Sequence, residues 1–118
     1  MKKFLMRFVY AFRGVVKAFK DVNLKWHGAA AIVVILTSWY YQLSMTEWII
    51  ILILIALVLA TEVINSSIED LNNTVTKANK LDYNATTDSR DMAAGAVLII
   101  TIVAVIVGLI IFIPKIFI

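Results

Sequence analysis

The feature that most constrains this chain is a set of long apolar stretches that contain no charged residue. One covers residues 28–46 and another covers residues 92–113. A helix rises about 1.5 Å per residue, so each stretch is long enough to cross a hydrocarbon core of about 30 Å. A further stretch, 48–60, is too short to cross by itself, and we expect its helix to continue over 48–69. The sequence therefore predicts three membrane-spanning helices.

Composition excludes several other classes of protein. Of 118 residues, 62% are hydrophobic and 16% are charged, whereas a soluble domain is about 25% charged. The chain has no cysteine, which excludes disulfides and thiolate metal sites. Its one histidine, His27, cannot make a multi-histidine metal centre. His27 is a minor candidate for chemistry, since a histidine at a span boundary is more often an interfacial hydrogen-bonding residue.

The segment 1–27 predicts an amphipathic helix that lies on the membrane surface. It carries seven of the 11 basic residues, and Phe4, Phe8 and Phe12 recur between them at helical spacing. Such a helix places its aromatic face in the interface and its cations near lipid phosphates. A signal peptide is the competing interpretation, but no uninterrupted apolar core or small-residue cleavage site follows the cations. No nucleic-acid partner is expected, because the aromatic face needs an apolar partner.

Basic residues also predict the topology. Segment 1–27 is strongly basic and segment 70–91 carries three cations, whereas the short turn near 43–47 carries none. By the positive-inside rule, the N-terminus and the 70–91 segment are cytoplasmic. We therefore expect an all-α, multi-pass membrane protein. It would form one domain, 1–118, with a surface helix and three transmembrane helices.

Glu62 is the most informative single residue, because a carboxylate inside a predicted spanning helix is costly and points to function. Glu62, Asn65, Ser66 and Glu69 follow at spacings of three and four, which places them on one helical face. That face predicts an acidic site where the helix leaves the membrane. The alternative is that the helix has already surfaced, with both carboxylates solvated.

Three more acids are predicted on the cytoplasmic side: Asp21, Asp70 and Asp91. Dispersed carboxylate oxygens suit Mg²⁺ that is held together with phosphates. Arg90 either binds phosphate or marks a membrane boundary. The chain has no glycine-rich nucleotide loop of the soluble kind, so the residues alone predict an acidic membrane site without a defined reaction.

Four segments carry a resemblance to a known family. Residues 62–69 resemble the E-x-x-N-[ST]-[AS]-I-E signature of the small prokaryotic diacylglycerol kinases, and 90–98 resemble their [AR]-K-D-x-A-A-G-A-V-L signature. Residues 10–14 and 21–27 look like the family's Y-A-x-x-G and E-R-N-x-R-x-H segments. The four matches occur in the family's order and extend over most of the chain.

The resemblance implies a homotrimeric lipid kinase of the bacterial cytoplasmic membrane. It would transfer the γ-phosphoryl group of ATP, bound with Mg²⁺, to a lipid hydroxyl. Glu62 matches the position of the general base, and Asn65 would orient the site. Asp21 and Glu69 match positions that bind the metal of Mg-ATP. Five side chains match nucleotide-binding or metal-binding positions: Tyr10, Asp21, Glu69, Arg90 and Asp91.

The departures from the family pattern are few. Asp21 stands where the family has Glu, Arg90 where it has Lys, and Asn73 where Asp is common; the 70–91 segment also looks slightly longer. Residues 23–27 and 93–98 look closer to the Gram-positive branch, whose members favour undecaprenol. Undecaprenol is therefore the expected substrate and diacylglycerol the alternative. A non-enzymatic membrane scaffold, or a proton-relay subunit that uses Glu62, is the other hypothesis.

Overall fold

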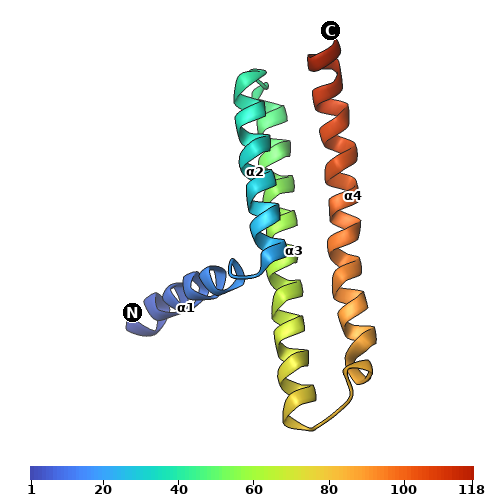
Figure 1. The fold of residues 1–118 in the computed structure, drawn as a ribbon. Helices are drawn as coiled ribbons and strands as arrows, with labels where there is room; N and C mark the ends of the chain where they lie inside the picture. Colours follow the sequence, from blue (N-terminus) through green and yellow to red (C-terminus); the bar gives the residue numbers. More distant parts are fainter.

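A computed structural model describes all residues, 1–118, and is entirely helical, as the sequence predicts (Figure 1). It contains four α-helices and one 3₁₀ turn: α1 (Lys2–Ala18), α2 (Val22–Tyr40), α3 (Met45–Ala78), η1 (Tyr83–Thr86) and α4 (Thr87–Phe117).

The helices form a thin bundle, 58 × 42 × 19 Å, around the long helix α3. α2 runs antiparallel to one half of α3, and α4 runs antiparallel along it on the other side (Figure 1). α1 projects sideways near the middle of α3 (Figure 1). This arrangement brings the start of α2 beside the middle of α3, where Glu62 lies.

The corner between α1 and α2 differs from the prediction. The surface helix expected over 1–27 ends at Ala18, and the first span, expected over 28–46, begins at Val22. Asp21 caps α2, because its Oδ1 accepts a hydrogen bond of 2.8 Å from the backbone N–H of Asn23. The polar residues after Asp21 therefore form the first turns of α2. The predicted span omitted them, because it was defined as a stretch without charged residues.

The turn between α2 and α3 lies a few residues earlier than predicted. α2 ends at Tyr40, short of residue 46, and α3 begins at Met45. Gln42 has φ 52°, and the N–H of Leu43 donates to the carbonyl of Ser38 at 3.2 Å. This pattern is a Schellman motif, which ends a helix by satisfying its last carbonyls. Because this motif ends α2 at Tyr40, the turn between the helices lies at residues 41–44, before the predicted turn near 43–47.

α3 and α4 both extend into the segment 70–91, which was expected to be loop-like in its second half. α3 continues to Ala78, beyond the predicted end at residue 69, and α4 begins at Thr87 rather than at 92. Asn72 donates to the Ser89 hydroxyl at 2.7 Å, so these polar turns pack on each other. Residues 79–82 remain as the loop. α4 also continues beyond 113 to Phe117, and Pro114 lies in its last turn.

Very little of the single chain is buried, which supports a membrane location. Only nine of 118 residues are buried, and large apolar side chains are exposed on every α-helix. Two helical segments are long and apolar enough to cross a membrane, Met45–Ala78 and Tyr83–Phe117. α2 has 19 residues, but its mean hydropathy is lower than that of the apolar stretches in these two segments, because its first turns contain Asn23, Lys25 and His27. The third crossing therefore stays a prediction, as does the surface position of α1.

Candidate active site

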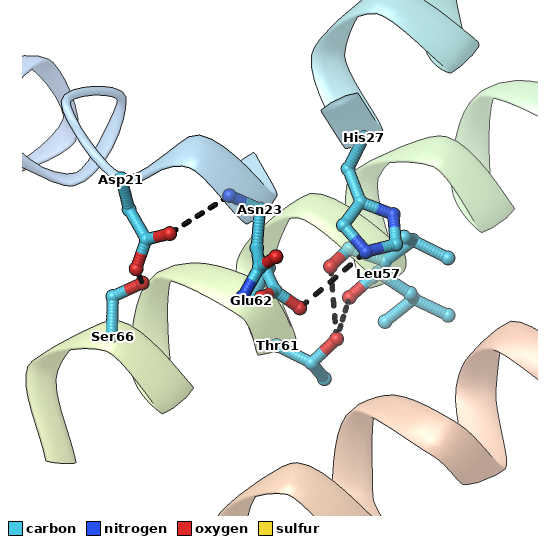
Figure 2. A network of polar contacts seen from close by, with 8 residues as sticks. Asp21, Asn23, His27, Leu57, Thr61, Glu62 and Ser66 are labelled. Atoms are coloured by element: carbon cyan, nitrogen blue, oxygen red, sulfur yellow. Dashed lines mark hydrogen bonds and ion pairs between the residues drawn. The ribbon is translucent and has the colours of Figure 1, made fainter. Parts of the chain in front are cut away.

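Glu62 is the most buried charged side chain of the protein, with 3% of its surface exposed. The first turns of α2 cover it, and the His27 Nε2 atom lies 3.6 Å from its Oε2 (Figure 2). Oε2 is enclosed and accepts no hydrogen bond. The alternative in which Glu62 is solvated at the helix exit is therefore wrong. Buried polar atoms are nearly always hydrogen-bonded, so an unpartnered carboxylate oxygen marks a candidate functional group.

The predicted polar face of α3 is present, and its members differ in their surroundings. Asn65 is half-buried one turn after Glu62, and its Oδ1 is also enclosed without a partner. Ser66 is half-buried as well and bonds to Asp21 of the α2 cap. Glu69 is half-buried one turn farther along. The structure thus gives two adjacent unsatisfied acceptors, those of Glu62 and Asn65.

Asp21 connects the α1–α2 corner to this face. Its Oδ1 caps α2, and its Oδ2 accepts a hydrogen bond of 3.0 Å from the Ser66 hydroxyl (Figure 2). Both oxygens are therefore oriented by the protein. The sequence predicted that Asp21 belongs to the site, but nothing in the spacing indicated Ser66 as its partner.

A groove of about 510 Å³ lies between α1 and α3, and we call it the polar groove. Its lining includes Gly14, Lys17, Asp21, Ser66 and Asp70. Two carboxylates, two serine hydroxyls (Ser67 also lines the groove) and an ammonium group suit a phosphate-bearing ligand accompanied by a cation. The prediction named Asp70 only as a cytoplasmic acid and missed Lys17, because the shared groove depends on the angle between α1 and α3.

The donor set fits Mg²⁺ only together with phosphate oxygens. No group of three or more His, Cys, Asp or Glu side chains is close enough to hold a metal ion. Mg²⁺ in nucleotide sites usually has one or two carboxylates and takes its other ligands from water and phosphates. Asp21 and Asp70 in the polar groove meet that need. Glu69, the other predicted metal ligand, does not line this groove.

The remaining predicted nucleotide-binding residues lie on α1 and at the start of α4. Tyr10 is exposed, and the Arg13 guanidinium lies 5.7 Å from the centre of its ring. Arg90 is buried at the start of α4, where its guanidinium lies 4.3 Å from the centre of the Tyr83 ring.

Part of the Arg90 side chain is occupied by the fold. Its Nε donates to the Thr86 hydroxyl at 2.9 Å, while its Nη2 is enclosed without a partner. Asp91 beside it is exposed. The hydrogen bond between Asn72 and Ser89 places this turn of α4 against the last turns of α3, beyond Glu69.

A second groove, of about 340 Å³, lies between α2, α3 and α4, and we call it the apolar groove. Twelve of its 15 lining residues are hydrophobic, and its polar members are His27 and Thr101. His27 is thus shared between this groove and Glu62 (Figure 2). The sequence analysis missed the groove, because it arises from the spacing of three helices; small residues such as Ala31, Ala104 and Gly108 were the available signal.

Comparison with known proteins identifies relatives over nearly the whole chain. The profile of a family described as prokaryotic diacylglycerol kinase matches residues 9–112. A protein of Bacillus subtilis (strain 168) named undecaprenol kinase is 34% identical over 116 residues, which is 98% of this chain and 92% of that protein. No solved structure matches the chain.

Proposed function

The chain belongs to the prokaryotic diacylglycerol kinase family and is a lipid kinase, and we propose that it converts undecaprenol to undecaprenyl phosphate. The observation that carries this proposal is the position of Glu62. Its enclosed carboxylate lies on α3 between His27, which lines the apolar groove, and Ser66, which lines the polar groove. Glu62 itself lines neither groove, and we infer that a lipid alcohol bound in the apolar groove and a phosphoryl donor bound in the polar groove reach it from these two neighbouring sites.

In the proposed reaction, Glu62 accepts the proton of the lipid hydroxyl as the hydroxyl oxygen attacks the γ-phosphorus of ATP. The new bond joins that oxygen to phosphorus, and the bond from phosphorus to the β-phosphate oxygen breaks, which releases ADP. Phosphoryl transfer needs mainly positioning and charge neutralisation, so few protein groups are required. Asn65, one turn away with an enclosed Oδ1, orients the reacting groups.

The polar groove is the proposed place of Mg-ATP. Asp21 and Asp70, which both line this groove, would hold Mg²⁺ there together with phosphate oxygens, and the bound ion would neutralise charge on the transferred phosphoryl group. Glu69, the other carboxylate that the family pattern assigns to the metal, lies outside the groove lining of the single chain. Asp21 is already oriented by Ser66 and Asn23, as a metal-binding carboxylate needs. The other nucleotide contacts are proposed for Tyr10, Arg90 and Asp91, and the unpartnered Nη2 of Arg90 is a donor available for a phosphate.

The apolar groove is the proposed place of the hydrocarbon chain. Along α4 it extends from Thr101 to Phe112, about 16 Å of helix. A lipid in this groove would present its hydroxyl at the end where His27 meets Glu62. The name of the Bacillus subtilis relative supports undecaprenol over diacylglycerol as the substrate.

We also propose that α2, α3 and α4 all cross the bacterial cytoplasmic membrane, with the N-terminus in the cytoplasm, and that the protein is a homotrimer. α2 lies antiparallel to α3, and α1 carries basic residues at the level where the polar groove opens (Figure 1). The exposed apolar faces of the helices need lipid or further copies of the chain to cover them.

The test is a phosphorylation assay with the purified protein in mixed micelles that contain undecaprenol or diacylglycerol, radiolabelled ATP and Mg²⁺. The proposal predicts label in the lipid fraction, dependence on Mg²⁺ and a clear preference for undecaprenol. A preference for diacylglycerol would replace the substrate. No lipid phosphorylation with either alcohol would overturn the proposal and favour a scaffold or a proton-relay subunit.

A proton-flux assay in liposomes separates those two non-enzymatic alternatives. A relay predicts a proton current that depends on membrane potential and on Glu62, whereas a scaffold predicts none. Lipid phosphorylation without such a current is the outcome that the proposal predicts.

A further inference from the structure

The mechanism above leaves one contact unused, the approach of His27 to Glu62. The imidazole Nε2 atom lies 3.6 Å from Oε2, and no hydrogen bond to that oxygen is present. The His27 side chain is 29% exposed and the Glu62 side chain 4% exposed, so the histidine is the more accessible of the pair. His27 also lines the apolar groove, where the lipid hydroxyl is proposed to arrive.

A buried carboxylate has to be ionised to act as a base, and burial in apolar surroundings opposes ionisation unless a donor stabilises the charge. The neighbouring Thr61 hydroxyl is not that donor, because it bonds to the carbonyls of Leu57 and Val58. The His27 imidazole presents a ring nitrogen, Nε2, that can carry a hydrogen and faces Oε2 at 3.6 Å (Figure 2).

Resting on the proposed function, we propose that His27 is a positioning residue. Its Nε2–H donates to Glu62 Oε2, which keeps the carboxylate ionised and leaves Oε1 for the lipid hydroxyl. The separation of 3.6 Å exceeds hydrogen-bonding distance, and a small rotation of either side chain closes it. Catalytic hydrogen bonds are often long before the substrate binds and shorten in the complex.

Few other charged groups compete for this contact. On α3, the charged group in contact with His27 is the Glu62 carboxylate. From α4 the apolar groove presents Thr101, which does not titrate in the physiological range. On the α2 side, Asp21 is bonded to Asn23 and Ser66, and Lys25 is exposed. The pair therefore acts as an isolated donor and acceptor.

The test compares His27→Ala with His27→Gln, because a glutamine amide can place an N–H near the position of Nε2 but does not titrate. A hydrogen bond to a charged group is worth about 10- to 100-fold in rate. We expect His27→Ala to lower kcat at neutral pH by that factor, with the KM for lipid changed less than about threefold. Its rate–pH profile should move to higher pH by about one to two units, so that activity recovers in alkali.

His27→Gln is the conservative variant, and we expect it to keep kcat within about threefold and to keep the acid limb of the profile in place. A loss of kcat in His27→Ala without movement of the acid limb would overturn the proposal and leave His27 a packing role. So would an equal loss in both variants.

A second measurement does not depend on turnover. Infrared difference spectra between each protein and its Glu62→Gln partner isolate the band of the Glu62 carboxyl group. We expect an ionised carboxylate at neutral pH in the wild type and in His27→Gln, and a protonated carboxyl in His27→Ala. An ionised Glu62 in His27→Ala would overturn the inference. A wild type that phosphorylates no lipid would instead overturn the proposed function, while the infrared result would still decide the role of His27.

Discussion

Two carboxylates on the same helix, Glu47 and Glu62, have opposite surroundings. Glu47 lies in the first turn of α3, where its carboxylate accepts the backbone N–H of Ser44 at 3.0 Å and pairs with the Lys115 ammonium at 3.2 Å. The hydrogen bond from Ser44, followed by that from Lys115, holds the pKa of Glu47 below its ordinary value. Glu62 is buried, and its Oε2 has no hydrogen-bond partner.

The difference shows how one residue type has a structural role at the start of a helix and a functional role in its middle. Glu47 and Ser44 form a capping box that fixes where α3 begins, and Lys115 joins that end to α4. The Glu47 carboxylate is therefore already bonded to partners inside the protein, Ser44 and Lys115. Glu62 leaves interactions unmade, which is the condition for a group that works on a ligand.

The largest expected effect separates the two carboxylates by activity. Glu62→Gln should lower kcat by about 10²- to 10⁴-fold, the usual contribution of a general base. Glu47→Gln is the matched control, and it should change kcat less than about threefold because its contacts lie at the opposite end of the membrane helices. Steady-state phosphorylation of undecaprenol measures both. Equal losses in the two variants would remove the distinction.

A second prediction concerns Asp21, which has partners and also faces the polar groove. Ser66→Ala removes the hydroxyl that orients Asp21 Oδ2, so we expect the apparent affinity for Mg²⁺ to fall about 10- to 100-fold. Ser67→Ala is the control, since Ser67 lines the same groove without bonding to Asp21. Titration of activity with Mg²⁺ gives both values. The same loss in both variants would argue against the role of the Ser66–Asp21 bond.

A third prediction concerns the structural end of α3. Ser44→Ala removes the hydroxyl that accepts the backbone N–H of Glu47 in the capping box. It should lower the free energy of unfolding by about 1 kcal/mol, with specific activity unchanged. Thr46→Ala is the control, because the Thr46 side chain makes no hydrogen bond. Thermal unfolding in detergent, measured beside the kinase assay, checks both. A drop in activity at full stability would contradict the assignment of this end to structure.

The smallest expected effect is a pH dependence of stability at Glu47. Because its pKa is lowered in the folded protein, Glu47 stabilises the fold above its ordinary pKa, and this contribution disappears as pH falls through the lowered value. The Tm difference between wild type and Glu47→Gln should be small at neutral pH, since exposed pairs are screened, and should vanish once the pH falls below the lowered pKa of Glu47. A difference that grows in acid would show that the sign is wrong.

Helical periodicity predicted the part of the site that lies on one helix. The spacing of Glu62 and Asn65 places both on one face of α3, and the structure shows both with enclosed, unpartnered oxygens. Helix bounds were less predictable, because counting charge-free residues ignores polar side chains that face protein. His27 is such a residue: it lies on α2 and faces Glu62, so the helix extends past the apolar stretch.

Features that depend on the angle between helices were not predictable from the sequence. The hydrogen bond between Asp21 and Ser66 joins residues 45 positions apart, and no local pattern encodes it. The packing of Arg90 on Tyr83 depends on the 3₁₀ turn that precedes α4. The apolar groove likewise exists only once α2 and α4 lie on either side of α3.

The most direct test of the central claim, that Glu62 meets the lipid hydroxyl, is labelling with a polyprenyl diazo analogue. Such a compound takes up the proton of a carboxylic acid and esterifies its oxygen with loss of N₂, so the labelling is done at mildly acidic pH, and mass spectrometry locates the ester. The account predicts an ester on Glu62, suppressed by undecaprenol, with Glu47 unlabelled. An ester on Glu47 or elsewhere with Glu62 unmodified would contradict it.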